Sequence, residues 1–384
     1  MKILMVSIFA PHFFNWTEQL RDSRHEVYWI DVFDSNTYVE KINFVHQIIG
    51  WRYRIKYPGR YWIKKNLPVL DGIVNNFNER NLAKTIEEKI KEIRPDVVQS
   101  FVLQTGAYPI LRVMKKYPEI KWIFSAWGND LFFRQQNTED LKDIKKTLPE
   151  FHYMFADCNR DYNVAVNHGF KGKFLGAYPG GGGYDLEIWE KLTKPLNSRK
   201  TILIKGYQGK LGRCNQILEA LFPLRDQLLN YEIIIFGDNA AVTNYIQEKG
   251  MDTWTNLSQL GQISHKEVLT LMGRSLIYIG NSISDGMPNT LLEAIVMGVF
   301  PIQSNPGGAT AEIIEHEKGG FLIEDPEDPE EIRKWILKAV NDHNLIYQGI
   351  EYNSKLVRPE LERDIVKKRV LKQYKIVEEE VKKL

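Results

Sequence analysis

The sequence predicts two doubly wound α/β domains, each built around a parallel β-sheet. Short runs rich in Val, Ile, Phe and Tyr alternate with longer amphipathic or charged stretches, which is typical of strand–helix–strand units. Many short runs are continuously apolar, such as Ile-Ile-Ile-Phe at 233–236, which favours strands covered on both faces. The alternation occurs twice along the 384 residues, so we expect two Rossmann-like domains.

The expected elements follow this alternation in chain order. Strands are predicted at 2–9, 26–33, 96–102, 121–127, 153–157 and 174–178, and again at 201–206, 231–236, 275–280, 299–304 and 319–323. Helical patterns are predicted at 83–93, 214–229, 265–273, 288–297 and 329–341. Because ligands bind parallel sheets at the carboxyl ends of the strands, we look for function in the segments that follow strands, lining a cleft between the two domains.

The domain limits are expected at 1–185 for the N-terminal domain and 186–358 for the C-terminal domain. A charged helix over 359–384 would pack back on the N-terminal domain. The run Gly180–Gly183 precedes the second series of elements and is conformationally free, so we interpret it as a hinge. The alternative is a wide surface turn.

The composition excludes a disordered, a collagen-like and a coiled-coil chain. Hydrophobic residues make up 43% and charged residues 26%, as in ordinary soluble domains. No apolar stretch is long enough for a spanning helix, and the apolar opening at 2–9 is interpreted as a buried strand and not as a signal peptide. Two cysteines, Cys158 and Cys214, favour a reduced, cytoplasmic chain, and no Cys/His cluster has zinc spacing, so no metal site is expected.

The segment after the strand at 275–280 is the most informative of the chain. It reads Asn-Ser-Ile-Ser-Asp-Gly-Met-Pro-Asn from 281 to 289, and its Gly286 and Pro288 suit a sharp turn into a helix. The N-terminus of that helix would offer free backbone N–H groups to anionic oxygens. Glu293 lies in the next turn among apolar residues. It either accepts hydrogen bonds from vicinal ribose hydroxyls or occupies the one polar stripe of the helix, and Asp285 has an alternative as a turn or cap residue.

This pattern resembles the donor-binding signature of retaining glycosyltransferases of family four, which have the GT-B fold. The family carries Glu-Gly-x-Pro followed by Leu-Glu-Ala, and this chain has Asp-Gly-Met-Pro at 285–288 and Leu-Glu-Ala at 292–294 with the same seven residues between the carboxylates. The order continues through Gly298, Pro301, Ser304, Gly307, Gly308, Glu312, Ile313, Ile314, Gly319, Gly320, Phe321 and Leu322. Asp285 stands where the family usually has Glu, so the carboxylate is shorter by one methylene.

The resemblance implies a role for each residue of this segment. Asp285 would contact the transferred sugar, and Glu293 would bind the ribose. The backbone of Gly286, Met287, Pro288 and Asn289 would face the sugar and the diphosphate. The implied donor is a nucleotide diphosphate sugar, used as a substrate, and no cofactor is implied.

A leaving diphosphate needs positive groups, and the loop after the strand at 201–206 offers three. Lys205, Lys210 and Arg213 stand there among glycines that include Gly206. Arg213 is the first choice because a guanidinium can hold phosphate oxygens with two hydrogen bonds. The alternative is that these side chains only solvate the surface.

The N-terminal domain contributes weaker candidates. Where the family often has a His-Gly pair, this chain has Trp127 and Gly128, so Asp130 is the nearest ionisable group for the sugar or the acceptor hydroxyl. Its alternative role is to cap a helix expected at Leu131. His12 follows the first strand and could line the cleft, although a single histidine is more often a partly buried loop residue.

Residues 41–70 carry an excess of positive charge that the net charge of +2 conceals. The segment contains no Asp or Glu, and its cationic residues are Lys41, Arg52, Arg54, Lys56, Arg60, Lys64 and Lys65. They alternate with Trp51, Tyr53, Tyr57, Tyr61 and Trp62. Cations with aromatics suit an anionic membrane interface and also single-stranded nucleic acid. Since many members of the resembled family glycosylate lipid-linked acceptors, we favour peripheral membrane contact, at the inner face of the cell membrane, over nucleic acid.

Three hypotheses follow. The first is a metal-independent, retaining hexosyltransferase that acts on a saccharide or lipid-linked acceptor in the synthesis of cell-surface glycans or glycolipids. The second is a sugar-nucleotide epimerase of similar fold, against which the Asp285 to Glu293 pattern argues. The third is a non-catalytic module whose 41–70 segment binds nucleic acid or a membrane.

Overall fold

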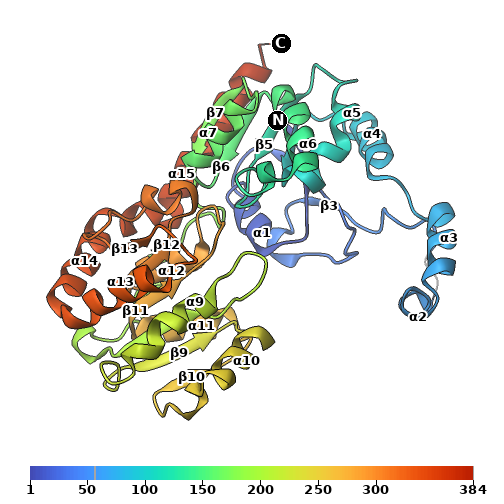
Figure 1. Cartoon of the computed structure of the whole chain (residues 1–384). Helices are drawn as coiled ribbons and strands as arrows, with labels where there is room; N and C mark the ends of the chain where they lie inside the picture. Colours follow the sequence, from blue (N-terminus) through green and yellow to red (C-terminus); the bar gives the residue numbers. More distant parts are fainter. Residues whose placement is uncertain (56–57, 384) are drawn as a thin grey trace. The chain divides into compact units, whose positions relative to one another are not determined.

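The computed structural model describes residues 1–55 and 58–383, which form two compact units. The first unit contains Met1–Ala156, Tyr162–Ala177 and the chain from Val370 onward, and the second contains Asp157–Asp161 and Tyr178–Arg369. Figure 1 colours both by residue number. The domain limits expected from the sequence stay a prediction. Asp157–Asp161 belongs to the second unit although its neighbours in sequence belong to the first, and the chain from Val370 onward returns to the first unit.

The first unit is built on a seven-stranded parallel sheet with the order β3-β2-β1-β4-β5-β6-β7. Its strands are β1 (Lys2–Ser7), β2 (Glu26–Asp31), β3 (His46–Ile48), β4 (Val97–Phe101), β5 (Lys121–Ser125), β6 (Tyr153–Ala156) and β7 (Lys173–Ala177). Its helices are α1 (Pro11–Glu18), α2 (Arg60–Asn66), α3 (Pro68–Asn78), α4 (Leu82–Ile93), α5 (Leu111–Met114), α6 (Thr138–Thr147) and most of α7 (Asn159–Asn167).

The second unit is built on a six-stranded parallel sheet with the order β10-β9-β8-β11-β12-β13. Its strands are β8 (Thr201–Lys205), β9 (Glu232–Phe236), β10 (Leu257–Gln259), β11 (Ser275–Gly280), β12 (Phe300–Ser304) and β13 (Phe321–Ile323). Its helices are α8 (Leu186–Glu190), α9 (Cys214–Leu221), α10 (Ala240–Glu248), α11 (His265–Arg274), α12 (Asn289–Val296), α13 (Pro329–Asn341) and α14 (His343–Leu356).

Apolar side chains cover both faces of the second sheet. Ile202 and Ile204 of β8 belong to one apolar cluster, whereas Leu203 between them belongs to another. Since successive side chains of a strand point to opposite faces, the two clusters lie on opposite sides of the sheet. The first cluster includes residues of α9 and α13, and the second includes residues of α11 and α12. This explains why the strand sequences are continuously apolar instead of alternating.

Sequence patterning predicted the inner strands and missed two edge strands. β3 has the sequence His-Gln-Ile and β10 has Leu-Ser-Gln, and both lie at an edge of their sheet. Three residues with mixed polarity give no periodic pattern, so pairing with the neighbouring strand decides their conformation. The helix predicted at 214–229 is also shorter, because Pro223 stands in a 3₁₀ turn over Phe222–Leu224 that follows α9.

The last helix, α15 (Arg363–Val381; red in Figure 1), begins in the second unit and contributes its later residues to the first. Tyr374 of this helix is fully buried in the first unit. Its hydroxyl accepts a hydrogen bond from Trp16 Nε1 at 3.1 Å and donates one to Gln99 Oε1 at 2.7 Å. The end of the chain is therefore an integral part of the first unit's core.

Candidate functional site

The loops at the carboxyl edge of the second sheet form the candidate site. They follow β8, β9, β11 and β12, which are adjacent strands of one parallel sheet. The two segments that the sequence singled out, 205–213 and 281–293, are the loops after β8 and β11 with the start of the helix behind the second. Since β8 and β11 pair directly, the sheet itself brings the two segments together.

Backbone hydrogen bonds join these two loops. The N–H of Arg213 donates to the carbonyl of Asn281 at 3.0 Å, and the N–H of Ile283 donates to the carbonyl of Leu211 at 3.0 Å. The Nδ2 of Asn281 adds a bond to the Arg213 carbonyl at 3.2 Å. The loop that carries the cationic residues is therefore held against the loop that carries Asp285 and Gly286.

Two glycines allow the backbone of these loops to pass very close to neighbouring side chains. A Cβ on Gly206 would lie 2.6 Å from a methyl of Ile235 and 2.7 Å from the Cβ of Asp238, so the loop after β8 can pass the end of β9 only with glycine there. A Cβ on Gly286 would lie 2.4 Å from a carboxylate oxygen of Asp157. The turn that the sequence predicted at Gly286 is therefore closed against a carboxylate, which sequence reasoning did not anticipate.

The three cationic candidates differ in their surroundings. The guanidinium of Arg213 pairs with the carboxylate of Glu327 and donates to the carbonyls of Gly209 and Gly212 at 2.8 and 2.9 Å. Lys205 ends β8 with a half-buried side chain, and its ammonium has no hydrogen-bond or ion-pair partner among residues 1–55 and 58–383. Lys210 is exposed. Lys205 is thus the cation with the most freedom to take an anionic ligand.

The start of α12 has no side-chain cap. Pro288 precedes the helix as its N-cap, and no side chain caps it, so the helix begins at Asn289, one residue later than predicted. The carbonyl of Pro288 accepts from the N–H groups of Leu291 and Leu292. The side chain of Asn289 accepts a hydrogen bond from the Tyr184 hydroxyl at 3.2 Å. First-turn amides without a side-chain cap are the groups that bind phosphate oxygens.

Asp285 and Met287 lie in the turn before this helix. The Oδ1 of Asp285 accepts from the N–H of Gly286 at 2.9 Å, and the Asp285 carbonyl accepts from Arg160 at 2.7 Å. Asp285 is partly exposed, and Met287 packs against the apolar cluster that contains α12. The Asp285 carboxylate thus makes the turn contact that its alternative role requires and is still accessible, so its contact with a sugar stays a prediction.

Glu293 is buried and has a partner that the sequence analysis did not identify. Its Oε1 lies 2.8 Å from Nε2 of His265, the first residue of α11. The hydrogen bond to Glu293 raises the pKa of His265, and partial burial of the imidazole opposes this effect. Because Glu293 is buried, its carboxylate must be hydrogen-bonded, and His265 provides one such bond. Spacing alone could not find this pair, since 28 positions separate its members.

Arg160 is a second residue that sequence reasoning missed. Its buried guanidinium donates to the carbonyls of Asp285 and Pro306, each at 2.7 Å, and pairs with Asp161 at 2.8 Å. The backbone N–H of Arg160 donates in turn to the carboxylate of Glu312 at 2.7 Å. One side chain therefore holds the loops after β11 and β12. Glu312 is one of the residues that continue the resemblance to family four in the sequence. Besides Asp285, it is the one residue of this network that the sequence pointed to.

Three side chains beside this network lie close enough to hold a metal ion. The ligand atoms of Asp157, Cys158 and Asp161 are within 4.8 Å of one another. Asp161 is already paired with Arg160, and burial raises the pKa of the Cys158 thiol, which keeps it protonated. Asp161 of this group already has a cationic partner in the Arg160 network, and the expectation of no metal site stays a prediction.

The candidates of the first unit lie after β1 and β5. Asp130 is buried, and its Oδ2 accepts from the N–H groups of Leu103 and Trp127, both at 3.2 Å. It joins two loops and precedes turns, not the helix expected at Leu131. His12 is exposed in α1, with its ring 6.3 Å from that of Trp127. The contacts of Asp130 therefore describe a loop-positioning residue, and its role toward a substrate stays a prediction.

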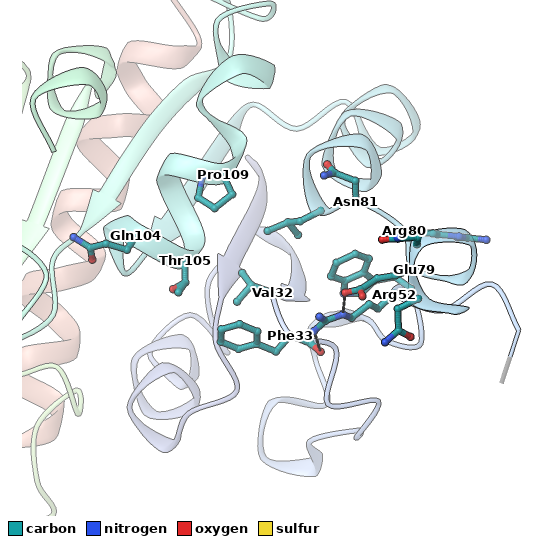
Figure 2. A pocket seen from close by; sticks show the side chains of 13 residues that line it. Val32, Phe33, Arg52, Glu79, Arg80, Asn81, Gln104, Thr105 and Pro109 are labelled. Carbon is teal, nitrogen blue, oxygen red and sulfur yellow. Dashed lines mark hydrogen bonds and ion pairs between the residues drawn. The ribbon is translucent and has the colours of Figure 1, made fainter. Parts of the chain in front are cut away.

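The first unit also contains a pocket of about 500 Å³ whose lining mixes polar and apolar side chains (Figure 2). The ion pair of Arg52 with Glu79 forms one wall, where Arg52 also donates to the Phe33 carbonyl at 3.2 Å. Thr105 brings a buried hydroxyl without a partner among the described residues. The lining is Val32, Phe33, Trp51, Arg52, Asn75, Asn76, Glu79, Arg80, Asn81, Leu82, Gln104, Thr105 and Pro109. Amide and aromatic side chains of this kind are suited to a hydroxyl-rich ligand.

Residues 188–356 match the model of a family described as glycosyl transferases group 1. This match lies within the second unit and contains every candidate of the loops after β8 and β11. The chain has no significant match among curated proteins. No helix of the described residues combines the length and the apolar character that crossing a membrane requires.

Solved structures share the fold at low sequence identity. A sucrose-phosphate synthase from Thermosynechococcus elongatus has a TM-score of 0.75 and 13% identity, over 98% of this chain and 99% of that chain. A glycosyltransferase from Rickettsia africae gives 0.65 and 17%, over 98% of both chains. Anabaena HepE in complex with UDP-glucose gives 0.70 and 13%, over 98% and 99%. These similarities confirm the predicted GT-B architecture of two Rossmann-like units.

Proposed function

Because residues 188–356 match the model of the group 1 glycosyl transferases, we propose that this chain moves a hexosyl unit from a nucleotide diphosphate sugar to an acceptor hydroxyl, with retention of anomeric configuration. The observation that carries the proposal is the pairing of two loops at an uncapped helix start. The loop with Lys205 and Arg213 is hydrogen-bonded to the loop that leads into α12. The cationic loop and the uncapped start of α12 therefore lie on neighbouring loops at the edge of the sheet.

The diphosphate of the donor would bind at this position. The first-turn amides of α12 can donate to its oxygens, and Lys205 has an ammonium without a protein partner among the described residues. Arg213 can add two parallel hydrogen bonds by exchanging Glu327, whose carboxylate is half exposed, for phosphate. These fixed positive groups would stabilise the leaving group, so the reaction is proposed to need no metal ion.

The sugar and the ribose would bind to the two carboxylates of the α12 region. Glu293 is buried beside His265 and can accept hydrogen bonds from the ribose hydroxyls, while His265 orients it. Asp285 would contact the transferred sugar. In the proposed step the bond from the anomeric carbon to the diphosphate breaks, the acceptor oxygen binds that carbon on the same face, and its proton passes to a diphosphate oxygen.

The range of donors and acceptors to be tested can be narrowed. HepE of Anabaena, which has the same fold, was solved with UDP-glucose, so UDP-hexoses are the first donors to test. The acceptor is proposed to be a saccharide or a lipid-linked molecule used in cell-surface glycan synthesis. The cationic and aromatic segment 41–70 supports peripheral contact with an anionic membrane. Lys56, Tyr57 and the side chains of Arg60 and Tyr61 lie outside the described residues.

A thermal-shift panel tests the proposal. The full chain is melted with UDP-, ADP-, GDP- and dTDP-hexoses, with the matching nucleoside diphosphates, and with EDTA added to each. A ligand at 100 times its Kd stabilises a protein by about 2.7 kcal/mol, so a true donor gives a clear rise in Tm that EDTA leaves unchanged. No shift with any member would reject the donor site. Interconversion of the free sugar nucleotide without an acceptor would favour the epimerase instead.

A further inference from the structure

The helical hairpin of α2 and α3 exposes an unusual amount of apolar surface. Val69 is 78% exposed and Phe77 is 77% exposed. The same short stretch also exposes Trp62, Leu67, Leu70 and Ile73. Soluble monomers expose single apolar side chains commonly, but contiguous apolar surface usually marks a binding site. Figure 1 shows the two helices lying apart from the sheet of their unit.

The exposed side chains of α3 share one face. Val69, Ile73 and Phe77 follow one another at intervals of four residues, which places them along a single stripe of the helix. Asn75 and Asn76 of the same helix line the pocket of Figure 2. The helix therefore presents an apolar stripe to solvent and amide groups to a pocket.

The base of the hairpin is fixed to the rest of the first unit. Asn78 is buried, its Oδ1 accepts from the N–H of Ile55 at 2.7 Å, and its Nδ2 donates to the Ile55 carbonyl at 2.8 Å. Next to it, the N–H of Arg80 donates to the Arg52 carbonyl at 2.7 Å, and Glu79 pairs with Arg52. The apolar stripe is thus carried on an anchored element and is not the loose end of a loop.

Charge indicates what the stripe faces. The hairpin residues 60–78 contain Arg60, Lys64 and Lys65 and one acidic residue, Asp71, and Lys64 and Lys65 are exposed at the end of α2. A protein partner with an apolar surface would not require this excess of positive charge. An anionic bilayer requires both features, since apolar side chains enter the headgroup boundary while Lys and Arg contact lipid phosphates.

We infer that the α2–α3 hairpin docks the chain on an anionic lipid bilayer, with Trp62, Val69 and Phe77 entering the interface. This inference rests on the proposed function in one respect: it makes the acceptor a lipid-borne molecule whose polar part reaches the pocket lined by Asn75 and Asn76. The hairpin belongs to the first unit and the donor loops to the second, so docking and donor binding can be measured separately.

Vesicle flotation of the full chain tests the inference. Vesicles of phosphatidylcholine are compared with vesicles that also contain about 30 mol% phosphatidylglycerol, at low and high salt. We expect binding to the anionic vesicles only, weakened by salt. The double variant Val69→Ser/Phe77→Ser should lose at least roughly tenfold in affinity for the anionic vesicles, because its stripe no longer enters the bilayer.

A matched control separates docking from general loss of surface hydrophobicity. Leu229 and Leu356 of the second unit are 59% and 58% exposed, and the variant Leu229→Ser/Leu356→Ser should bind vesicles as the unaltered chain does. Both variants should keep the Tm shift with the sugar nucleotide. As a direct readout, lipids brominated in their acyl chains should quench tryptophan fluorescence, and Trp62→Phe should remove most of that quenching.

Several results would overturn the inference. One is vesicle binding that Val69→Ser/Phe77→Ser leaves unchanged, and another is no vesicle binding by a chain that a sugar nucleotide still stabilises. A dimer in lipid-free solution that this variant converts to a monomer would assign the stripe to self-association. Binding to single-stranded oligonucleotides without binding to vesicles would assign the segment to nucleic acid. Vesicle binding without any nucleotide-sugar shift would support docking and reject the proposed transferase.

Discussion

The Nε2 of His265 lies 2.8 Å from the Oε1 of Glu293 and joins the start of α11 to the second turn of α12. The Glu293 side chain is 9% exposed, whereas that of His265 is 63% exposed. The carboxylate is therefore inside the protein and its partner is at the surface. A solvent-accessible imidazole that holds a buried carboxylate can couple the donor site to pH.

The first prediction concerns that coupling. The hydrogen bond to Glu293 raises the pKa of His265 in the folded chain, so the stabilisation is fully present below the unfolded value of about 6.5 and is lost as pH rises through the folded value. We expect the unaltered chain to be more stable than His265→Gln near pH 6 and the difference to vanish above the folded pKa. The difference should stay below about 1 kcal/mol, because the imidazole is largely exposed.

Denaturant unfolding at several pH values measures this difference. Glu293→Gln is the control, because it keeps the size of the side chain and removes the charge that raises the pKa of His265. In that background, His265→Gln should give a difference that does not change between pH 6 and pH 8. An unchanged pH dependence there would assign the effect to another group.

The second prediction concerns donor binding by Glu293. Glu293→Ala should remove most of the Tm shift produced by the sugar nucleotide, because the ribose hydroxyls lose their acceptor. The cost to folding should be small, since the imidazole left behind is already exposed to water. Calorimetry with UDP and with the nucleoside uridine gives the affinities directly. Equal affinity of both proteins for these ligands would reject the ribose role.

Sequence patterning was sufficient for the fold and for the position of the loops that follow β8 and β11. The strand runs, such as 233–236, and the turn at Gly286 both follow from local sequence, so they could be predicted. The edge strands β3 and β10 could not, because their short polar sequences have no pattern of their own. The helices α2 and α3 were not predicted either, since the sequence showed a cationic excess there without indicating which apolar residues stay exposed.

The partners of the site residues could not be predicted, for a different reason. Arg160 contacts Asp285 and Pro306 through bonds that span more than a hundred positions in the chain. The sequence placed His265 only at the start of the helix predicted at 265–273, and its bond to Glu293 depends on how α11 and α12 pack. Such contacts are set by tertiary structure. Local propensity contains no information about them, which is why the candidate residues were found and their immediate partners were not.

The third prediction concerns the diphosphate. Lys205→Gln should weaken UDP binding by roughly 10- to 100-fold, the range expected for one charge-assisted hydrogen bond, and should leave the weak binding of uridine unchanged. Lys200→Gln is the matched control, because Lys200 is exposed just before the opposite end of the same strand. Calorimetry with UDP, UMP and uridine separates the phosphates. Equal losses for all three ligands would show that Lys205 supports the fold instead of the phosphate.

The fourth prediction concerns the buried pair of Arg160 and Asp161, which are 7% and 0% exposed. Arg160→Met should destabilise the chain by about 3–5 kcal/mol, because it leaves the Asp161 carboxylate buried without its cation. The double variant Arg160→Met/Asp161→Leu removes that unpaired charge and should recover much of the loss. It should still bind donor poorly, since the carbonyls of Asp285 and Pro306 have lost the guanidinium that holds their loops.

Unfolding free energies and UDP affinities of the two variants separate these effects. Recovery of both quantities in the double variant would mean that Arg160 acts only by compensating Asp161. Recovery of stability without affinity would assign Arg160 to positioning of the loop that contains Asp285 and Gly286. The geometry favours the second result, because the same guanidinium makes both the ion pair and the two carbonyl bonds, and only the ion pair becomes dispensable when Asp161 is replaced.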